Sequence, residues 1–131
     1  MHTSQTRRSQ VFVLSAGYAH MKFTVIVCSN DPETVWNAPR FATVSSVYEN
    51  RVTVFLLGKG VEAMSVGTFK YDVQEQAELF RQHGGVILGC GVCCENRKEE
   101  MPFLLRELRC EMGSMQDLYG LVAEADKVIT F

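Results

Sequence analysis

The chain lacks both a long apolar run and an excess of basic residues. No stretch of its 131 residues approaches the roughly 20 consecutive apolar residues that a membrane-spanning helix requires. Lys and Arg total 13 against 15 Asp and Glu, for a net charge of −2, and the basic residues are scattered. A nucleic-acid-binding domain would normally show a strongly basic face. We therefore expect a protein that binds neither membranes nor nucleic acids.

The common motifs for nucleotide and zinc binding are also absent. Gly58-Lys59-Gly60 lacks the spacing of a P-loop, and Gly89-x-Gly91 lacks the third glycine of a dinucleotide-binding loop. One C-x-x-C pair is present, but no second pair of cysteines or histidines completes a four-ligand zinc site. A zinc ion would need His83 and Cys28 to converge on that pair. The sequence thus predicts neither a metal nor a cofactor.

The first twenty residues differ in character from the rest of the chain. Two arginines precede an apolar patch, but its uninterrupted run, 11–14, is far shorter than the ~7–15 residues of a secretory leader. A strand pattern follows directly after His20 and Met21. We interpret residues 1–20 as a leader, a tag or a mis-assigned start, and we assign residues 21–131 to one domain, a length suited to a single core.

Strand patterns alternate with helix patterns from residue 21 onward. Apolar, mostly β-branched runs at 23–28, 52–57, 85–89 and 127–131 are typical of strands in a parallel sheet. A shorter strand is predicted over 108–112, where it would carry Cys110. We therefore predict a single α/β domain with a mainly parallel five-stranded sheet, helices on both faces and flavodoxin-like layering.

Prolines and capping residues mark the predicted helices. Pro32 begins the first helix, and Pro39 either kinks it or separates a short turn from a second helix capped by Asn37. The other helices are predicted from the capping boxes Asp72/Glu75 and Ser114/Asp117, and over residues 95–108, which Pro102 interrupts.

Three of the five cysteines lie within the run Gly89-Cys90-Gly91-Val92-Cys93-Cys94. An odd count with such crowding is unlike the spread disulfides of small secreted domains, so we expect a reducing, cytoplasmic location. The run follows a predicted strand, and ligands of open parallel sheets bind beyond the carboxyl ends of the strands. The sequence therefore predicts a reactive thiol site at this turn.

Cys90 is the leading candidate within the turn. The pKa of a cysteine falls at a helix N-terminus, near cations or in a C-x-x-C pair, and Cys90 can have all three, with Arg97 and Lys98 as the cations. Cys93 is spaced to attack sulfur carried on Cys90. The alternative for each thiol is an unreactive buried cysteine, and for Cys28 and Cys110, which fall in strand patterns, that alternative is favoured.

Four markers in order along the chain resemble the DsrE/DsrF-like sulfur-relay proteins, TusD-like members among them. They are Asn30-Asp31-Pro32-Glu33, the run 54–61, His83-Gly84 shortly before Cys90, and the segment 115–131 that begins Met115-x-Asp117-Leu118. The resemblance covers residues 21–131 and implies the same α/β layout. It also implies a trimer or hexamer, here a homotrimer or larger ring.

The same resemblance implies roles for individual residues. Cys90 would accept sulfane sulfur as a persulfide and hand it to a partner thiol, with Cys93 as the second thiol of a C-G-x-C motif. Arg97 matches an arginine that follows this motif, and Asn30 and Cys94 are further site candidates. The chain departs from the pattern at Cys94, at Lys98 and at the prolines of positions 39 and 102.

Three functions are compatible with a reactive thiol pair on this turn. The first is a sulfur relay or sulfurtransferase that works with donor and acceptor proteins or small sulfane-sulfur donors. The second is a thiol-disulfide oxidoreductase that cycles Cys90 and Cys93, although a thioredoxin normally places its C-x-x-C after an early strand. The third is a non-catalytic oligomeric module that senses redox state.

Overall fold

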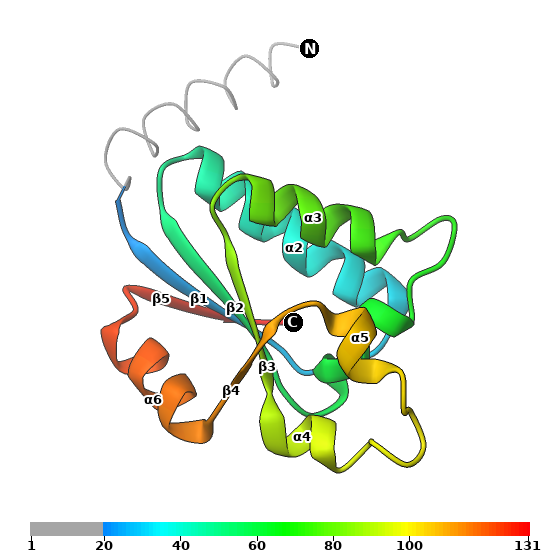
Figure 1. Cartoon of the computed structure of the whole chain (residues 1–131). Coiled ribbons are helices and arrows are strands. Elements are labelled where there is room, and N and C mark those ends of the chain that lie inside the picture. The colour runs from blue at the N-terminus through cyan, green and yellow to red at the C-terminus, as the bar shows by residue number, and fades with distance from the viewer. Residues whose placement is uncertain (1–19) are drawn as a thin grey trace.

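The computed structural model describes residues 20–131, which fold around a five-stranded sheet with every pairing parallel (Figure 1). The strand order is β4-β3-β2-β1-β5. Apart from His20, the segment interpreted as a leader, tag or mis-assigned start lies outside the described residues. The strands are β1 (Lys22–Val27), β2 (Arg51–Leu56), β3 (Val86–Cys90), β4 (Glu111–Gly113) and β5 (Lys127–Thr130).

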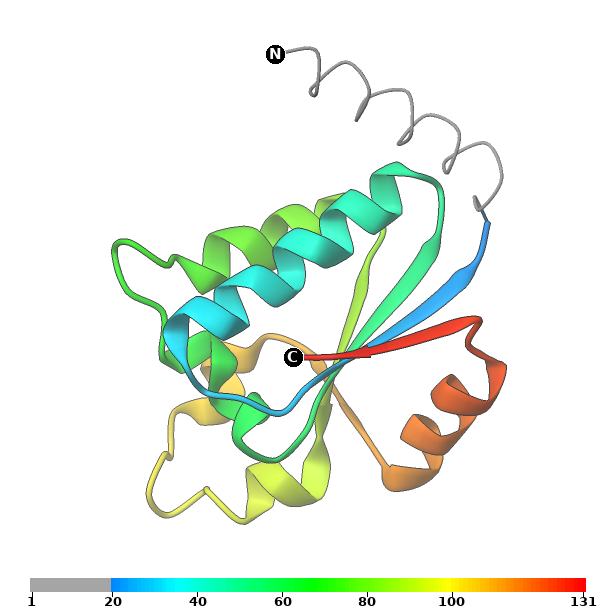
Figure 2. The ribbon, with the colours of Figure 1, turned by 180° about the vertical axis from the view of Figure 1, so that it is seen from behind.

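Helices cover both faces of the sheet, so the predicted single α/β domain is confirmed (Figures 1 and 2). Helices α2 (Pro32–Val47) and α3 (Val73–Gln82) lie on one face, and α6 (Met115–Glu124) lies on the other, where Thr24 Oγ1 of β1 donates to the Leu121 carbonyl. The strand order differs from that of flavodoxin, in which β1 lies between β2 and β3. The short helices η1 (Gly58–Ser65), α4 (Gly91–Glu95) and α5 (Leu104–Leu108) complete the fold.

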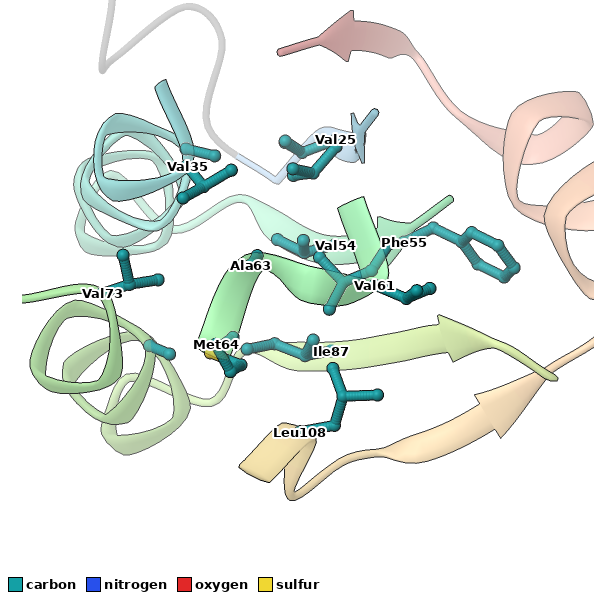
Figure 3. Close-up of a cluster of buried hydrophobic side chains, with 14 of the residues drawn as sticks. Val25, Val35, Val54, Phe55, Val61, Ala63, Met64, Val73, Ile87 and Leu108 are labelled. Carbon is teal, nitrogen blue, oxygen red and sulfur yellow. The ribbon is translucent and has the colours of Figure 1, made fainter. Parts of the chain in front are cut away.

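Alternating strand residues form the core. Figure 3 shows Val54 and Phe55 on opposite sides of β2, as successive strand side chains must be. Val25, Val54 and Ile87 point toward α2 and α3, whereas Phe55 points to the α6 side and is fully buried. Burying each such side chain contributes about 1.5–3 kcal/mol. The core thus fixes how the carboxyl ends of β1, β2 and β3 lie beside one another.

Helix α2 continues through Pro39, so the alternative of two helices is wrong. Asp31 caps it by accepting the Thr34 N–H at 3.0 Å. Asn37 is not a cap, because its side-chain amide donates to the Glu33 carbonyl inside the helix. Pro39 removes one helical hydrogen bond, but it is buried with its neighbours against the sheet and α3, and this tertiary packing outweighs the loss.

The segment between β3 and β4 is less helical than predicted. Only α4 and α5 are helical, and turns containing Pro102 separate them. Leu104 and Leu108 of α5 are buried, and this helix packs against η1. The predicted strand over 108–112 is instead Glu111–Gly113, so Cys110 precedes the strand rather than lying in it.

Candidate functional site

The carboxyl ends of β1, β2 and β3 bring three chain segments together at one edge of the sheet. Asn30 follows β1, Glu62 lies on η1 after β2, and Cys90 with Cys93 lies where β3 meets α4. Parallel strands end at the same edge, which explains why residues so far apart in sequence meet there. Asn30, Cys90, Cys93 and Arg97, all expected from the sequence, belong to this cluster.

Cys90 is both the last residue of β3 and the N-cap of α4. Its backbone is extended (φ −63°, ψ 116°), and its Sγ accepts a hydrogen bond from the Cys93 N–H at 3.4 Å. The residue is only 4% exposed. A backbone N–H directed at a sulfur is a donor that a persulfide on that sulfur can also use. Cys90 is therefore a buried sulfur with one backbone donor and little contact with water.

Cys93 is the more accessible of the two thiols. It is half-buried, and its Sγ accepts a hydrogen bond from the Gly58 N–H at 3.2 Å. Burial raises the pKa of Cys93 above its usual 9.0, and the adjacent Cys90 side chain raises it further, against lowering by Gly58 and Arg97. Cys93 is therefore mostly protonated at neutral pH. It shares the turn with Cys90 and can exchange sulfur with it.

Two glycines let η1 reach Cys93. Gly58 has a φ of +57°, the left-handed region that favours glycine, and its N–H donates to Cys93. A Cβ on Gly60 would lie 1.8 Å from the Val27 carbonyl oxygen, so only glycine allows η1 to approach the end of β1 so closely. This approach sets the position of Glu62, two residues further along.

Glu62 connects the three segments and was not predicted from the sequence. Its Oε1 accepts from Asn30 Nδ2 at 3.2 Å, and its Oε2 accepts from Arg97 Nε at 2.7 Å. Arg97 Nη1 also donates to the Cys93 carbonyl at 3.1 Å. The bond from Arg97 is the main reason that the pKa of Glu62 is lowered. The available signal was that Glu62 is the one acidic residue in the segment that follows the second strand.

The other candidate residues lie at the margin of the site. Cys94 is buried, and burial raises its pKa. Lys98 does not reach the thiols, since its Nζ pairs with Glu95 at 3.0 Å on an exposed surface. The expectation of a buried Cys28 is wrong, because the residue lies just past the end of β1 and is exposed. Cys110 is half-buried, and burial raises its pKa to about 11.

Within residues 20–131, no three His, Cys, Asp or Glu side chains lie close enough together to hold a metal ion. In the same range, no helix combines the length and the apolar character needed to cross a membrane. His83, the histidine that a zinc site would need, is the exposed C-cap of α3.

The fold and the site together define an all-parallel α/β domain with a cysteine-centred site beyond its central strands. The model of the DsrE/DsrF-like family matches residues 21–131, and the chain belongs to this family. Family membership suggests a function related to sulfur relay, in which these proteins generally act with partner proteins.

Two other proteins resemble this chain, one in sequence and one in fold. An uncharacterised protein of Methanopyrus kandleri is 30% identical over 112 residues, which cover 81% of this chain and 91% of that protein. The solved structure of a conserved protein of unknown function from Bacteroides thetaiotaomicron is similar, with a TM-score of 0.67 and 21% identity. The match covers 90% of this chain and 98% of the other, and it supports the fold.

Proposed function

We propose that this protein carries sulfane sulfur as a cysteine persulfide on the Cys90/Cys93 turn and passes it to a partner thiol. The observation that carries the proposal is that a buried thiol, Cys90, lies beside a more accessible one, Cys93, whose N–H donates to Cys90 Sγ. A persulfide on a buried thiol is protected from unwanted exchange with thiols in solution. The accessible thiol beside it can receive sulfur from a donor and pass it to an acceptor.

Each transfer is one thiol exchange. The thiolate form of Cys93, a minor fraction at neutral pH, attacks the terminal sulfur of a donor persulfide, R–S–SH; a new S–S bond forms on Cys93, the donor S–S bond breaks, and the donor leaves as R–S⁻. The proton stays on the transferred sulfur, and no external oxidant or reductant is needed. A second exchange moves that sulfur to the Cys90 thiolate and regenerates the Cys93 thiolate. The reverse steps deliver sulfur to the acceptor.

The partners in this proposal are sulfur-donor and sulfur-acceptor proteins or small sulfane-sulfur donors, met in the cytoplasm. A homotrimer or hexamer is part of the proposal and is supported by apolar side chains that stay exposed around α6 and β5. These are Met115, Tyr119, Val122 and Val128, which are 61, 76, 39 and 45% exposed. Contiguous exposed apolar residues commonly mark protein interfaces. Light scattering coupled to gel filtration measures the subunit number, and a monomer would contradict this part.

The experiment that tests the function is intact-mass analysis after incubation with a sulfane-sulfur donor. We expect a gain of about 32 Da, the mass of one sulfur, in the wild-type protein. Cys93→Ser should load more slowly, because the accessible thiol is lost, and Cys90→Ser should load but release its sulfur rapidly to an added thiol. Cys28→Ser, which removes an exposed thiol outside the turn, is the control and should behave as wild type.

Other outcomes favour the alternatives. Turnover of a protein disulfide without the mass gain would indicate an oxidoreductase that cycles Cys90 and Cys93. Inertness in both assays with a stable oligomer would indicate a binding module. A stable adduct in Cys90→Ser that is absent from Cys93→Ser would show that Cys93, not Cys90, is the carrier.

A further inference from the structure

The carboxylate of Glu62 is the one group that touches both other segments of the site. Asn30 after β1 donates to one of its oxygens, and Arg97 after α4 donates to the other. The side chains of Arg97 and Glu62 are only 22% and 19% exposed, so water screens the pair less than it would at the surface. The ion pair between Arg97 and Glu62 can therefore affect the charge next to the Cys93 sulfur as well as the position of the chain segments that it joins.

We infer that Glu62 is a positioning residue that restrains the reactivity of Cys93 by holding and neutralising Arg97. Arg97 donates to the Cys93 carbonyl, so its guanidinium stays next to that residue. A free guanidinium at this place would stabilise the thiolate, whereas one paired with a carboxylate 2.7 Å away presents much less net charge. The inference rests on the proposed function for its biological meaning, since Cys93 is there the entry thiol.

The charged and titratable groups around Cys93 come from three elements. On its own short helix and the turn that follows are Cys94 and Arg97, and Cys90 lies at the end of β3. On η1, Glu62 faces Arg97, and the positive charge of Lys59 is close enough to help lower the pKa of Glu62. The uncharged Gly58 N–H completes the surroundings. Arg97 is thus the cation that acts on the sulfur, and Glu62 is the carboxylate that pairs with it.

Two substitutions separate electrostatic restraint from a purely structural role. Glu62→Gln keeps an oxygen that can accept from Arg97 Nε while removing the negative charge, so Arg97 stays in place with its full charge. Arg97→Gln removes the positive charge. Electrostatic restraint predicts opposite effects on Cys93, whereas loss of a merely structural contact would change reactivity in the same direction in both variants.

The matched control is Glu95→Gln. Glu95 lies on α4, two residues from Cys93, and carries the same charge as Glu62, but it pairs with Lys98 in solvent. Its replacement changes the net charge of the protein by the same amount without touching Arg97. Any effect shared by Glu95→Gln and Glu62→Gln would therefore come from overall charge.

The test is the pH dependence of iodoacetamide alkylation at Cys93, quantified by fragmentation of the tryptic peptide of residues 82–97, or of residues 82–98 in Arg97→Gln, which lacks the cleavage site after position 97. At pH 7 we expect Glu62→Gln to react about two- to tenfold faster than wild type, as expected for one partly screened charge. Its rate profile should shift to lower pH. Arg97→Gln should react more slowly, with its profile shifted to higher pH, and Glu95→Gln should match wild type.

Three results would overturn the inference: unchanged or slower alkylation in Glu62→Gln, equal acceleration in Glu95→Gln, or unchanged or faster alkylation in Arg97→Gln. Circular dichroism melts establish that the variants fold, and if Glu62→Gln does not, Glu62→Met, which has a similar length and no charge, takes its place in the comparison with Arg97→Gln. Because alkylation needs no sulfur donor, its outcome is independent of persulfide formation. The alkylation results can therefore support the role of Glu62 even if no persulfide forms. Equally, a persulfide can form even if Glu62 has no effect on Cys93.

Discussion

Gly60→Ala is expected to destabilise the fold and to disrupt the thiol site together. A Cβ at this position would lie 1.8 Å from the Val27 carbonyl oxygen and 2.6 Å from the carbonyl carbon. Both are backbone atoms in β1, an interior strand of the sheet, so η1 must move away. Overpacking of this kind costs about 3 kcal/mol, which lowers the melting temperature of a domain of this size by about 10 °C. The displacement also withdraws the Gly58 N–H from Cys93 Sγ.

Gly120→Ala is the matched control with the opposite expected sign. Gly120 lies inside α6, and an added Cβ would meet no atom within 4 Å. Alanine should therefore stabilise the helix by about 0.5–1 kcal/mol. Urea unfolding followed by circular dichroism measures both variants, and alkylation of Cys93 reports the site. A Gly60→Ala protein as stable as wild type, with unchanged Cys93 reactivity, would show that the position of η1 does not depend on glycine at position 60.

Two further predictions concern the core and a half-buried thiol. Leu108→Ala should cost about 2–5 kcal/mol in chemical unfolding because Leu108 is fully buried, whereas Leu105→Ala on the same helix, 58% exposed, should change stability by less than about 0.5 kcal/mol; equal effects would contradict the placement of α5. For Cys110, a folded-state pKa of about 11 against an ordinary 9.0 means that its stabilising contribution is complete below pH 9 and is lost as pH rises toward 11. Wild type should therefore lose about 2 kcal/mol more than Cys110→Ala between these pH values, and identical slopes in pH-dependent unfolding would rule this out.

The sequence was most informative where local pattern decides the structure. The β-branched runs predicted the strands, and the spacing of Cys90 and Cys93 predicted two thiols on one turn, because neighbours along the chain are neighbours in space. The capping box at Ser114 and Asp117 begins α6 as predicted, with both reciprocal hydrogen bonds present. At Asp72 only one half forms, with the side chain accepting from the Glu75 N–H.

The features that were missed depend on contacts between distant segments. The position of Glu62 follows from the approach of Gly60 to Val27, which no local pattern encodes. The continuity of α2 through Pro39 depends on packing against the sheet and α3. Cys28 carries a strand-like pattern, but the strand ends one residue earlier. Cys28 is exposed because it lies beyond the last residue of the strand.

Site-resolved persulfide mapping shows directly whether sulfur is held on the turn after β3. The protein is loaded with a sulfane-sulfur donor, the donor is removed, persulfides are blocked by alkylation, and the tryptic peptide of residues 82–97 is fragmented. We expect an additional sulfur of about 32 Da on Cys90, with a minor fraction on Cys93. Sulfur confined to Cys28 or Cys110, or undiminished loading when Cys90 and Cys93 are both replaced by Ser, would contradict it.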